Sequence, residues 1–349
     1  YRLPSEETLT DAKLNEFIMR HSGECAFRYS MLQEAYETDY PLLHEPLKPK
    51  WKPDNRIMVN FAKYIVDTMN GFFIGHPIKL QVDDGNEAVE KYVDFLDQYN
   101  DQDDNNAELS KICSIFGKGY EMYYVDENGN IGITYLSPLD AFMIYDDSVL
   151  ERERYFVWLY YDSNQILHGS VSDETKVRWF TIKGKLLWDA DEKIHGFDGV
   201  PASEYVENKE RMGIFEPVLT MINAYNKAIS EKANDVVAHI RDDRIINFDG
   251  DTERLIVEFL QKPDGDTTQE HLIDRLEKLI FHISMVANIS DENFGTSSGI
   301  AMKYKLQAMS NLEKTKERKF TSGMNRRYRL IFSNPVSGRK KDDWVKIHP

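Results

Sequence analysis

The residues with the most suggestive catalytic spacing are 295–299, which read Gly-Thr-Ser-Ser-Gly and match the G-x-S-x-G pattern of hydrolases. In those enzymes the serine, here Ser297, follows a buried strand, and the acid and histidine of the triad come later in the sequence. The preceding residues, Ile289–Phe294, are too polar for a buried strand, and His348 is the only histidine that follows. The motif is also not followed by the Lys-Ser or Lys-Thr pair of a phosphate-binding loop. We therefore interpret 295–299 as a loop between helices and keep a serine hydrolase as an alternative.

A second candidate is a metal site, because residues 101–105 carry alternating carboxylates like the start of a calcium-binding loop. The pattern fails at two required positions: Asn106 replaces the glycine, and Ile112 stands in place of the bidentate glutamate. The nine histidines form no H-x-x-x-H pair and no cluster with cysteine, which disfavours zinc. We predict no catalytic residues, no metal and no cofactor, and we interpret residues 100–106 as a solvated linker.

The composition is that of a folded but acidic protein. Hydrophobic residues make up 41% of the 349 residues, charged residues make up 29%, and the formal net charge is −16. Because proteins that grip duplex DNA by neutralising phosphates are usually basic, this chain as a whole is not such a protein. Two cysteines, Cys25 and Cys113, cannot build a disulfide framework, so a reducing compartment is expected. Without a signal-like segment or an apolar run that could span a bilayer, we expect neither secretion nor membrane insertion.

The first 120 residues are expected to be mainly helical. Apolar residues at helical spacing predict one helix before residue 40 and another with its apolar face from Ile57 to Met69. This second helix would be capped by Asp54 or Asn55 and would end at Asn70-Gly71. Four prolines between residues 40 and 53 exclude an α-helix there and indicate an extended arm. The remaining predicted elements are a strand at 78–82, a helix at 88–99 and a helix around 109–116.

The period of the apolar residues changes to two near residue 120, which predicts strands. Residues 120–125 and 131–136 flank Asn128-Gly129, a strong hairpin signal because such residues accept the positive φ of a tight turn. Further strands are expected at 142–145, 155–161, 177–182 and 185–188. We therefore predict an α+β fold with an antiparallel sheet.

Two long amphipathic helices are predicted in the second half of the chain. Phe215-Glu216-Pro217 opens the first, and a capping box at Thr267–Glu270 opens the second. A short module at 238–266, with one strand at 255–260, lies between them. Their apolar stripes are Val218, Ile222, Tyr225, Ile229, Ala233 and Val236 on the first helix, and Leu272, Leu276, Leu279, Ile280 and Ile283 on the second. Because the sequence offers no partner domain for these stripes, we expect contacts between identical copies to bury them.

A third predicted helix passes through Tyr304 and Leu312 and leads to a basic cluster. The cluster consists of Lys314, Lys316, Arg318, Lys319, Arg326, Arg327 and Arg329. One interpretation is a solvated helix face on which Glu313 and Glu317 pair with the cations. The other is a patch that faces nucleic acid or an acidic neighbouring subunit.

Several of these segments together resemble the portal proteins of long-tailed phages that infect Gram-positive bacteria. The similarity lies in Met285–Leu306 with Lys316–Phe320, in Asn70–Ile78, and in Phe215–Pro217 with Ala224–Lys227. It covers about residues 10–332, and it is the combination that is specific, since no one segment would carry it alone.

The resemblance implies an α+β portal fold whose parts follow one another along the chain. They are a wing at 1–212, a first stem helix at 213–237, a clip at 238–266, a second stem helix at 267–287, a tunnel loop at 288–299, a long helix returning to the wing at 300–332, and a remnant of wing and crown at 333–349. The crown would be largely absent from these residues.

The same resemblance implies a homo-oligomeric ring, usually of twelve subunits, assembled in the host cytoplasm and placed at the portal vertex of the virion. Double-stranded DNA would pass along the tunnel loop at Asn288, Ser290, Asp291, Glu292, Asn293, Phe294, Thr296, Ser297 and Ser298. The clip would bind partners through Arg241, Asp242, Asp243, Arg244, Glu258 and Phe259. The implied partners are the terminase large subunit, the major capsid and scaffolding proteins and a head-completion or adaptor protein, with no membrane. A head protein that never contacts DNA is a further alternative.

Overall fold

The computed structural model describes residues 1–83, 86–242, 265–289, 303 and 306–349, with 239–242 and 265–266 described through their backbone alone. The chain forms two compact units. Unit 1 comprises Tyr1–Gln33, Val66–Ile214 and Met309–Pro349, and unit 2 comprises Glu34–Ile65 and Phe215–Ala308. The structure is 49% helical and 20% strand, which confirms the predicted α+β class. Within the described ranges, no helix is both long enough and apolar enough to cross a membrane.

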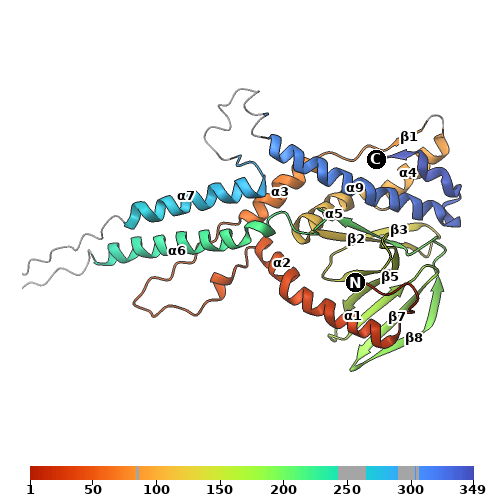
Figure 1. Cartoon of the computed structure of the whole chain (residues 1–349), viewed down its shortest axis with the longest axis horizontal. Coiled ribbons are helices and arrows are strands. Elements are labelled where there is room, and N and C mark those ends of the chain that lie inside the picture. Colours follow the sequence, from red (N-terminus) through yellow and green to blue (C-terminus); the bar gives the residue numbers. More distant parts are fainter. Residues whose placement is uncertain (84–85, 243–264, 290–302, 304–305) are drawn as a thin grey trace, which may run out of the picture. The chain divides into compact units, whose positions relative to one another are not determined.

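Unit 1 contains two larger antiparallel sheets (Figure 1). The first has the order β3-β2-β9 and is built from β2 (Lys118–Val125), β3 (Ile131–Leu136) and β9 (Ala202–Val206). The second follows the order of the chain and is built from β4 (Ala141–Tyr145), β5 (Glu153–Tyr161), β6 (Leu167–Ser172), β7 (Lys176–Lys183) and β8 (Lys185–Ile194). A short pair joins β1 (Gln81–Val82) to β10 (Ile347–His348). The predicted hairpin and the four further strands are confirmed, whereas the prediction has no strand at β6 or β9.

Aspartate side chains that fold back onto the backbone form the tight turns of both sheets. Asp126 Oδ1 accepts the backbone N–H groups of Asn128 and Asn130 at 2.9 and 2.8 Å. Gly129 adopts a φ of +78°, which a glycine accepts without strain. Asp162 accepts two backbone N–H groups in the same way between β5 and β6. The turn chemistry therefore sets the register of both hairpins.

Of the helices that the structure describes, five longer ones belong wholly or partly to unit 1. They are α1 (Asp11–Glu24), α3 (Phe61–Ile74), α4 (Glu87–Tyr99), α5 (Gln102–Phe116) and α9 (Gln307–Ser333). A π-helical turn, Cys25–Tyr29, continues α1 into α2 (Ser30–Tyr36). The chain after α9 adds two short 3₁₀ turns, Pro335–Ser337 and Lys341–Lys346.

Two of the predicted helix boundaries are wrong. Asn60, rather than Asp54 or Asn55, caps α3, because its side chain accepts the Lys63 N–H at 2.8 Å, and the helix continues through Gly71 to Ile74. The polar run after residue 100 is the start of α5 and not a solvated linker. Its amides Gln102 and Asn106 are buried, so these polar residues face inward.

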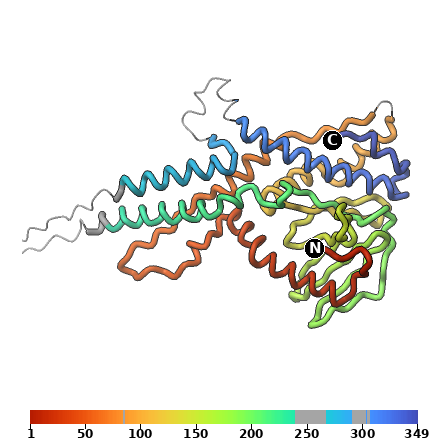
Figure 2. The backbone as a smooth tube through the Cα atoms, viewed as in Figure 1, coloured from red at the N-terminus to blue at the C-terminus, as the bar shows by residue number. Residues whose placement is uncertain are grey.

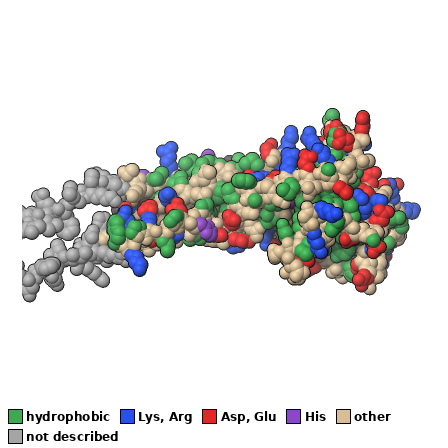
Figure 3. Space-filling model, turned by 90° about the horizontal axis from the view of Figure 1, so that it is seen from below, with side chains coloured by type: hydrophobic (Ala, Val, Ile, Leu, Met, Phe, Trp, Pro, Cys, Tyr) green, Lys and Arg blue, Asp and Glu red, His purple; other side chains and the backbone are tan. Residues whose placement is uncertain are grey.

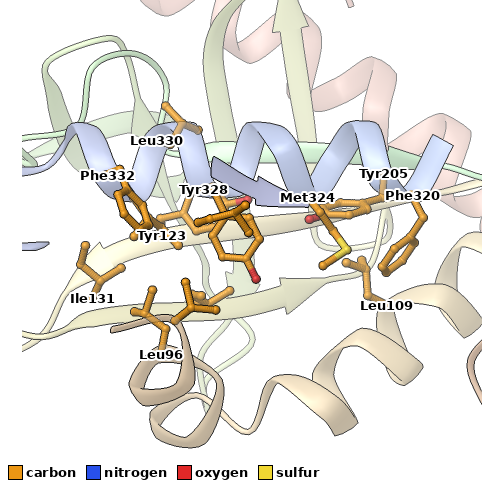
Figure 4. Packing of buried hydrophobic residues seen from close by; sticks show 14 of the residues in the cluster. Leu96, Leu109, Tyr123, Ile131, Tyr205, Phe320, Met324, Tyr328, Leu330 and Phe332 are labelled. Carbon is orange, nitrogen blue, oxygen red and sulfur yellow. The ribbon is translucent and has the colours of Figure 1, made fainter. Parts of the chain in front are cut away.

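One apolar core of unit 1 joins α9 to α4, α5 and the three-stranded sheet (Figure 4). Phe320 and Met324 of α9 lie toward Leu109 and Tyr205, and Phe332 lies toward Ile131. A second core packs α1 onto the five-stranded sheet, with Leu14, Phe17, Ile18, Phe142, Val157 and Phe180 among its members. The apolar spacing of α1 and α4 thus corresponds to their buried faces.

Unit 2 is built from α6 (Leu219–Asp242) and α7 (Gly265–Ser284), which pack against each other. A 3₁₀ turn, Glu216–Val218, holds Pro217 in the first turn before α6, as predicted. The prediction that a capping box at Thr267–Glu270 starts the second helix is wrong, because α7 already begins at Gly265 and Thr267 lies inside it. Figure 2 shows the segment after α2 leaving in a loop and returning beside α6. This loop is the predicted extended arm, interrupted by a 3₁₀ turn at Pro41–His44. The strand predicted at 255–260 lies outside the described residues.

Candidate assembly and channel surfaces

The apolar stripes of α6 and α7 are only partly covered within this chain. Ile222 and Ile280 are fully buried, and the ring of Phe281 lies 5.5 Å from those of Phe61 and Tyr64 at the start of α3. Leu272, however, is 51% exposed, and Ile283 and Val236 are exposed as well. The expectation that other copies bury both stripes entirely is therefore too simple. Each stripe has a covered portion and a free one.

A second face of α6 is polar and is occupied by the returning arm. Asn226, Ser230 and Asn234 are buried and lie four residues apart, so they share one helix face. They accept the backbone N–H groups of Val59, Ile57 and Asn55 at 2.8, 2.9 and 2.6 Å, respectively. Since buried backbone donors need partners, this face holds residues 55–59 in place. It is not available to line a channel.

The tip of the arm is ordered by Arg56. Its guanidinium group donates to the carbonyl groups of Leu43 and Pro46 at 2.7 and 3.1 Å and pairs with Asp54 at 3.0 Å. Lys48 in turn pairs with Glu231 of α6 at 2.8 Å. The arm is thus a fixed part of unit 2 in spite of its prolines.

The predicted tunnel loop is described only at its first residues. The Asn288 side chain donates to Glu277 at 3.3 Å, and Tyr64 Oη accepts the Ile289 N–H at 2.9 Å. These bonds tie the start of the loop to α7 and α3 within unit 2. The remaining predicted residues, Ser290, Asp291, Glu292, Asn293, Phe294, Thr296, Ser297 and Ser298, lie outside the described residues, as does the G-x-S-x-G motif.

The predicted clip residues also fall mostly outside the described part of the chain. Arg241 and Asp242 belong to the last turn of α6, which continues beyond the predicted end of the first stem helix at 237. Asp243, Arg244, Glu258 and Phe259 are not described.

The basic cluster of α9 divides into buried and exposed cations, which corrects both interpretations of it as one surface. Lys316 and Arg327 are buried and form ion pairs with Glu207 and Glu121. Arg326 pairs with Glu153 at 3.1 Å. The remaining members, Lys314, Arg318, Lys319 and Arg329, are exposed or half-buried. The cluster therefore holds the fold together from one side of α9 and carries surface charge on another.

Arg327 is the centre of a buried polar network. Its guanidinium group makes two hydrogen bonds to the Glu121 carboxylate, at 2.9 and 2.5 Å, and one to Asn106 Oδ1 at 2.6 Å. The hydroxyl groups of Tyr123 and Tyr205 donate to the same carboxylate. Burial by itself would lower the pKa of Arg327, but the Glu121 carboxylate outweighs it and holds that pKa above its ordinary value. Arg327 is therefore charged, and so fixed by its partners that it is not available to a ligand.

Sequence reasoning missed this network because its members are scattered. Glu121 lies in the middle of a strand whose neighbours are apolar, and Glu207 follows a strand that was not predicted. A carboxylate inside a strand with apolar residues on both sides is the one available signal, since it requires a partner when buried. Nothing in the sequence identifies Arg327 as that partner. Within the described ranges, no group of His, Cys, Asp and Glu could hold a metal ion.

Comparison of the sequence with known proteins finds a family model and a relative whose descriptions agree. Residues 15–349 match the family model described as phage portal protein, SPP1 Gp6-like. A protein of Clostridium phage phiCD119, named portal protein, is 24% identical over 323 residues, covering 77% of this chain and 70% of that protein.

Proposed function

Because this chain belongs to the family of SPP1 Gp6-like phage portal proteins, we propose that it forms a homo-oligomeric ring, usually of twelve subunits, through which double-stranded DNA enters and leaves the capsid. The family is structural rather than enzymatic. The ring would sit at the portal vertex of the virion after assembly in the host cytoplasm. Its partners would be the major capsid and scaffolding proteins, the terminase large subunit, which would supply ATP hydrolysis, and a head-completion or adaptor protein.

The assignment of parts follows the family. We propose that residues 1–212 form the wing, α6 and α7 the two stem helices, 238–266 the clip, 288–299 the tunnel loop, 300–332 the helix that returns to the wing, and 333–349 a remnant of wing and crown. The match over residues 15–349 carries the proposal. The free portions of the α6 and α7 stripes support it, because exposed apolar residues in a folded chain indicate a surface that another protein covers.

The charge also supports a passive channel. A chain with a net charge of −16 makes few tight contacts with phosphates, so a duplex can slide past it. On the face drawn in Figure 3, acidic and basic side chains are interspersed rather than segregated.

Negative-stain electron microscopy of the purified 349-residue chain tests the ring. We expect particles with a central hole, whereas uniformly small compact particles would contradict the proposal. Replacing Leu272 and Ile283 by aspartate should abolish the rings, because both side chains are exposed on one face of α7. The matched control is Val149→Asp, which alters a fully exposed residue between β4 and β5 and should leave the rings intact.

The role of the tunnel loop requires a separate test. Replacing Asp291 and Glu292 by alanine in the phage should change the length of packaged DNA if the loop touches the duplex. Asp274→Ala, an exposed acidic residue of α7, serves as the control. Packaging that is unaltered by the loop substitutions would remove the loop from the mechanism without affecting the ring.

A further inference from the structure

Unit 1 contains a pocket of about 490 Å³ whose polar lining is mainly basic. Five cations line it: Lys209, Arg211, Lys319, Arg326 and Arg329. Two of them have carboxylate partners, since Arg211 pairs with Glu204 at 2.6 Å and Arg326 pairs with Glu153 at 3.1 Å. Both carboxylates belong to the pocket wall, so the pocket neutralises only part of its own positive charge.

The other three cations have no counter-charge in the described structure. Lys209, Lys319 and Arg329 form neither an ion pair nor a side-chain hydrogen bond with any described residue. The excess charge acts on its neighbour: burial lowers the pKa of Arg326, and Arg329 lowers it further, although Glu153 opposes both. Three unpaired cations around one pocket give it a local excess of positive charge, although the whole chain has a net charge of −16. The chemistry of the site is that of an oxyanion receptor.

The shape of the pocket favours carboxylate side chains over a nucleic acid. A duplex bound through its phosphates needs cations spread along an extended surface. Here the cations surround a hollow whose wall also contains Glu153, Glu204 and the apolar side chains of Val206 and Trp344. Because Glu153 and Glu204 are already paired with Arg326 and Arg211, three unpaired cations remain, which suffice for two carboxylate side chains but not for the many phosphates of a duplex. A pair of acidic side chains with some apolar surface fits this lining better.

Strand β8 of unit 1 has the complementary chemistry. It is the last strand of the five-stranded sheet, so one edge of its backbone pairs with no other described strand. Asp189 and Asp191 are exposed and have no cation partner in the described structure, and they lie where the register of β8 against β7 shifts between Trp188 and Glu192. Leu187 of the same strand is exposed too, and Ile194 is 79% exposed. A long edge strand with exposed apolar residues is a surface that folded proteins normally cover.

The pocket and the strand belong to the same unit but lie apart. Figure 1 shows β8 at one margin of unit 1 and α9, which supplies Lys319 and Arg329, at the other. One copy therefore cannot place its own β8 in its own pocket. Two different and complementary patches on one chain are what a head-to-tail contact requires, and such contacts form a ring when the rotation from copy to copy closes.

We propose that the pocket around Lys209, Lys319 and Arg329 receives Asp189 and Asp191 of a second copy, so that β8 of each subunit docks on α9 of the next. The inference rests on the proposed ring. It adds to the ring a specific polar contact between neighbouring copies.

A charge exchange tests this contact, with ring formation followed by electron microscopy and by size-exclusion chromatography with light scattering. The pocket variant K319E/R329E and the strand variant D189K/D191K should each lose at least tenfold in the fraction of assembled protein. The quadruple variant, which carries both exchanges, should recover most of it, because the pair is restored with opposite sign. K50E/K52E makes the same change of charge at two exposed lysines of the arm and should assemble normally.

The outcomes separate this inference from the proposed function. All variants concern exposed or half-buried side chains, so circular dichroism and thermal denaturation should show folded protein. Absence of rings from the unaltered chain would contradict the proposed function itself. Rings from the unaltered chain and equally from K319E/R329E would overturn the contact alone. Loss of assembly in both double variants without recovery in the quadruple variant would likewise overturn the pairing with β8.

Discussion

Lys316 Nζ lies 2.7 Å from Glu207 Oε2, and both side chains are only 2% exposed. The ammonium group also donates to Ser114 Oγ at 2.5 Å and to the Ser110 carbonyl group at 3.0 Å, so all three of its protons are used. Lys316 belongs to α9, the two serines belong to α5, and Glu207 follows β9. The pair therefore fastens α9 to elements that are far away in the sequence.

Replacing Lys316 by methionine should lower the free energy of unfolding by about 3–5 kcal/mol, because Glu207 would remain buried without a counter-charge. Urea denaturation followed by circular dichroism measures the change. Lys314→Met lies two residues earlier on the exposed side of the same helix and should stay within about 0.5 kcal/mol of the unaltered chain. The double variant K316M/E207L removes both charges and should recover much of the loss. Equal losses for the Lys314 and Lys316 variants would contradict the structural role of the pair.

Gly323 of α9 is predicted to be intolerant of any side chain. A Cβ atom there would lie 2.4 Å from the ring of Tyr205, which is fully buried and whose hydroxyl group donates to Glu121 at 2.8 Å. Because the ring cannot easily move, Gly323→Ala should lower the free energy of unfolding by about 1–3 kcal/mol. Gly71 of α3 has nothing within 4 Å of its Cβ position, so Gly71→Ala should raise that free energy by about 0.5–1 kcal/mol. Thermal denaturation of both variants measures the two changes in the free energy of unfolding. A change of the same sign in both variants would refute this explanation.

The polar face of α6 predicts a local effect on hydrogen exchange. In Asn226→Ala the Val59 N–H loses its acceptor at 2.8 Å, and an unsatisfied buried donor costs about 1–3 kcal/mol. The amides of residues 55–59 should then exchange faster, while those of the β2–β3 hairpin should not change. Thr220→Ala, at an exposed position of the same helix, is the matched control. Uniform acceleration over the whole chain would indicate general destabilisation instead of a released arm.

The spacing of apolar residues along the sequence was sufficient to predict the helices that bury a single face. The apolar spacing of α1 and α4 gave their positions, because each has one buried face and one solvated face. It failed for β6, which contains Gly169 and three other small or polar residues. A Cβ at Gly169 would lie 2.5 Å from the ring of Phe180, so the glycine is needed for packing between strands rather than for a turn. Pairing with neighbours, which a single segment cannot reveal, makes this sequence a strand.

The basic cluster shows why a candidate surface is harder to predict than an element. Lys316 and Lys319 are three residues apart and identical in type, yet the first is buried in an ion pair and the second lines an accessible pocket. Which of them turns inward depends on Glu207, more than a hundred residues earlier in the chain. Local sequence gives the charge of a helix, whereas only the tertiary fold distributes that charge between core and surface.

His21 should give the stability a pH dependence of definite sign. It is buried beside Tyr1 and Phe142, and burial lowers its pKa from 6.5 to about 4, with the positive charge of Lys118 adding to the effect. Between pH 6.5 and pH 4 the unfolded chain binds a proton that the folded chain does not, so the free energy of unfolding falls as the pH falls. The contribution of His21 to this fall in the free energy of unfolding should be on the order of 3 kcal/mol. Urea denaturation at pH 7 and pH 4.5 should therefore show a smaller decline for His21→Gln than for the unaltered chain. The same substitution at the exposed His76 should leave the decline unchanged, and an unchanged decline in His21→Gln would exclude this histidine as its source.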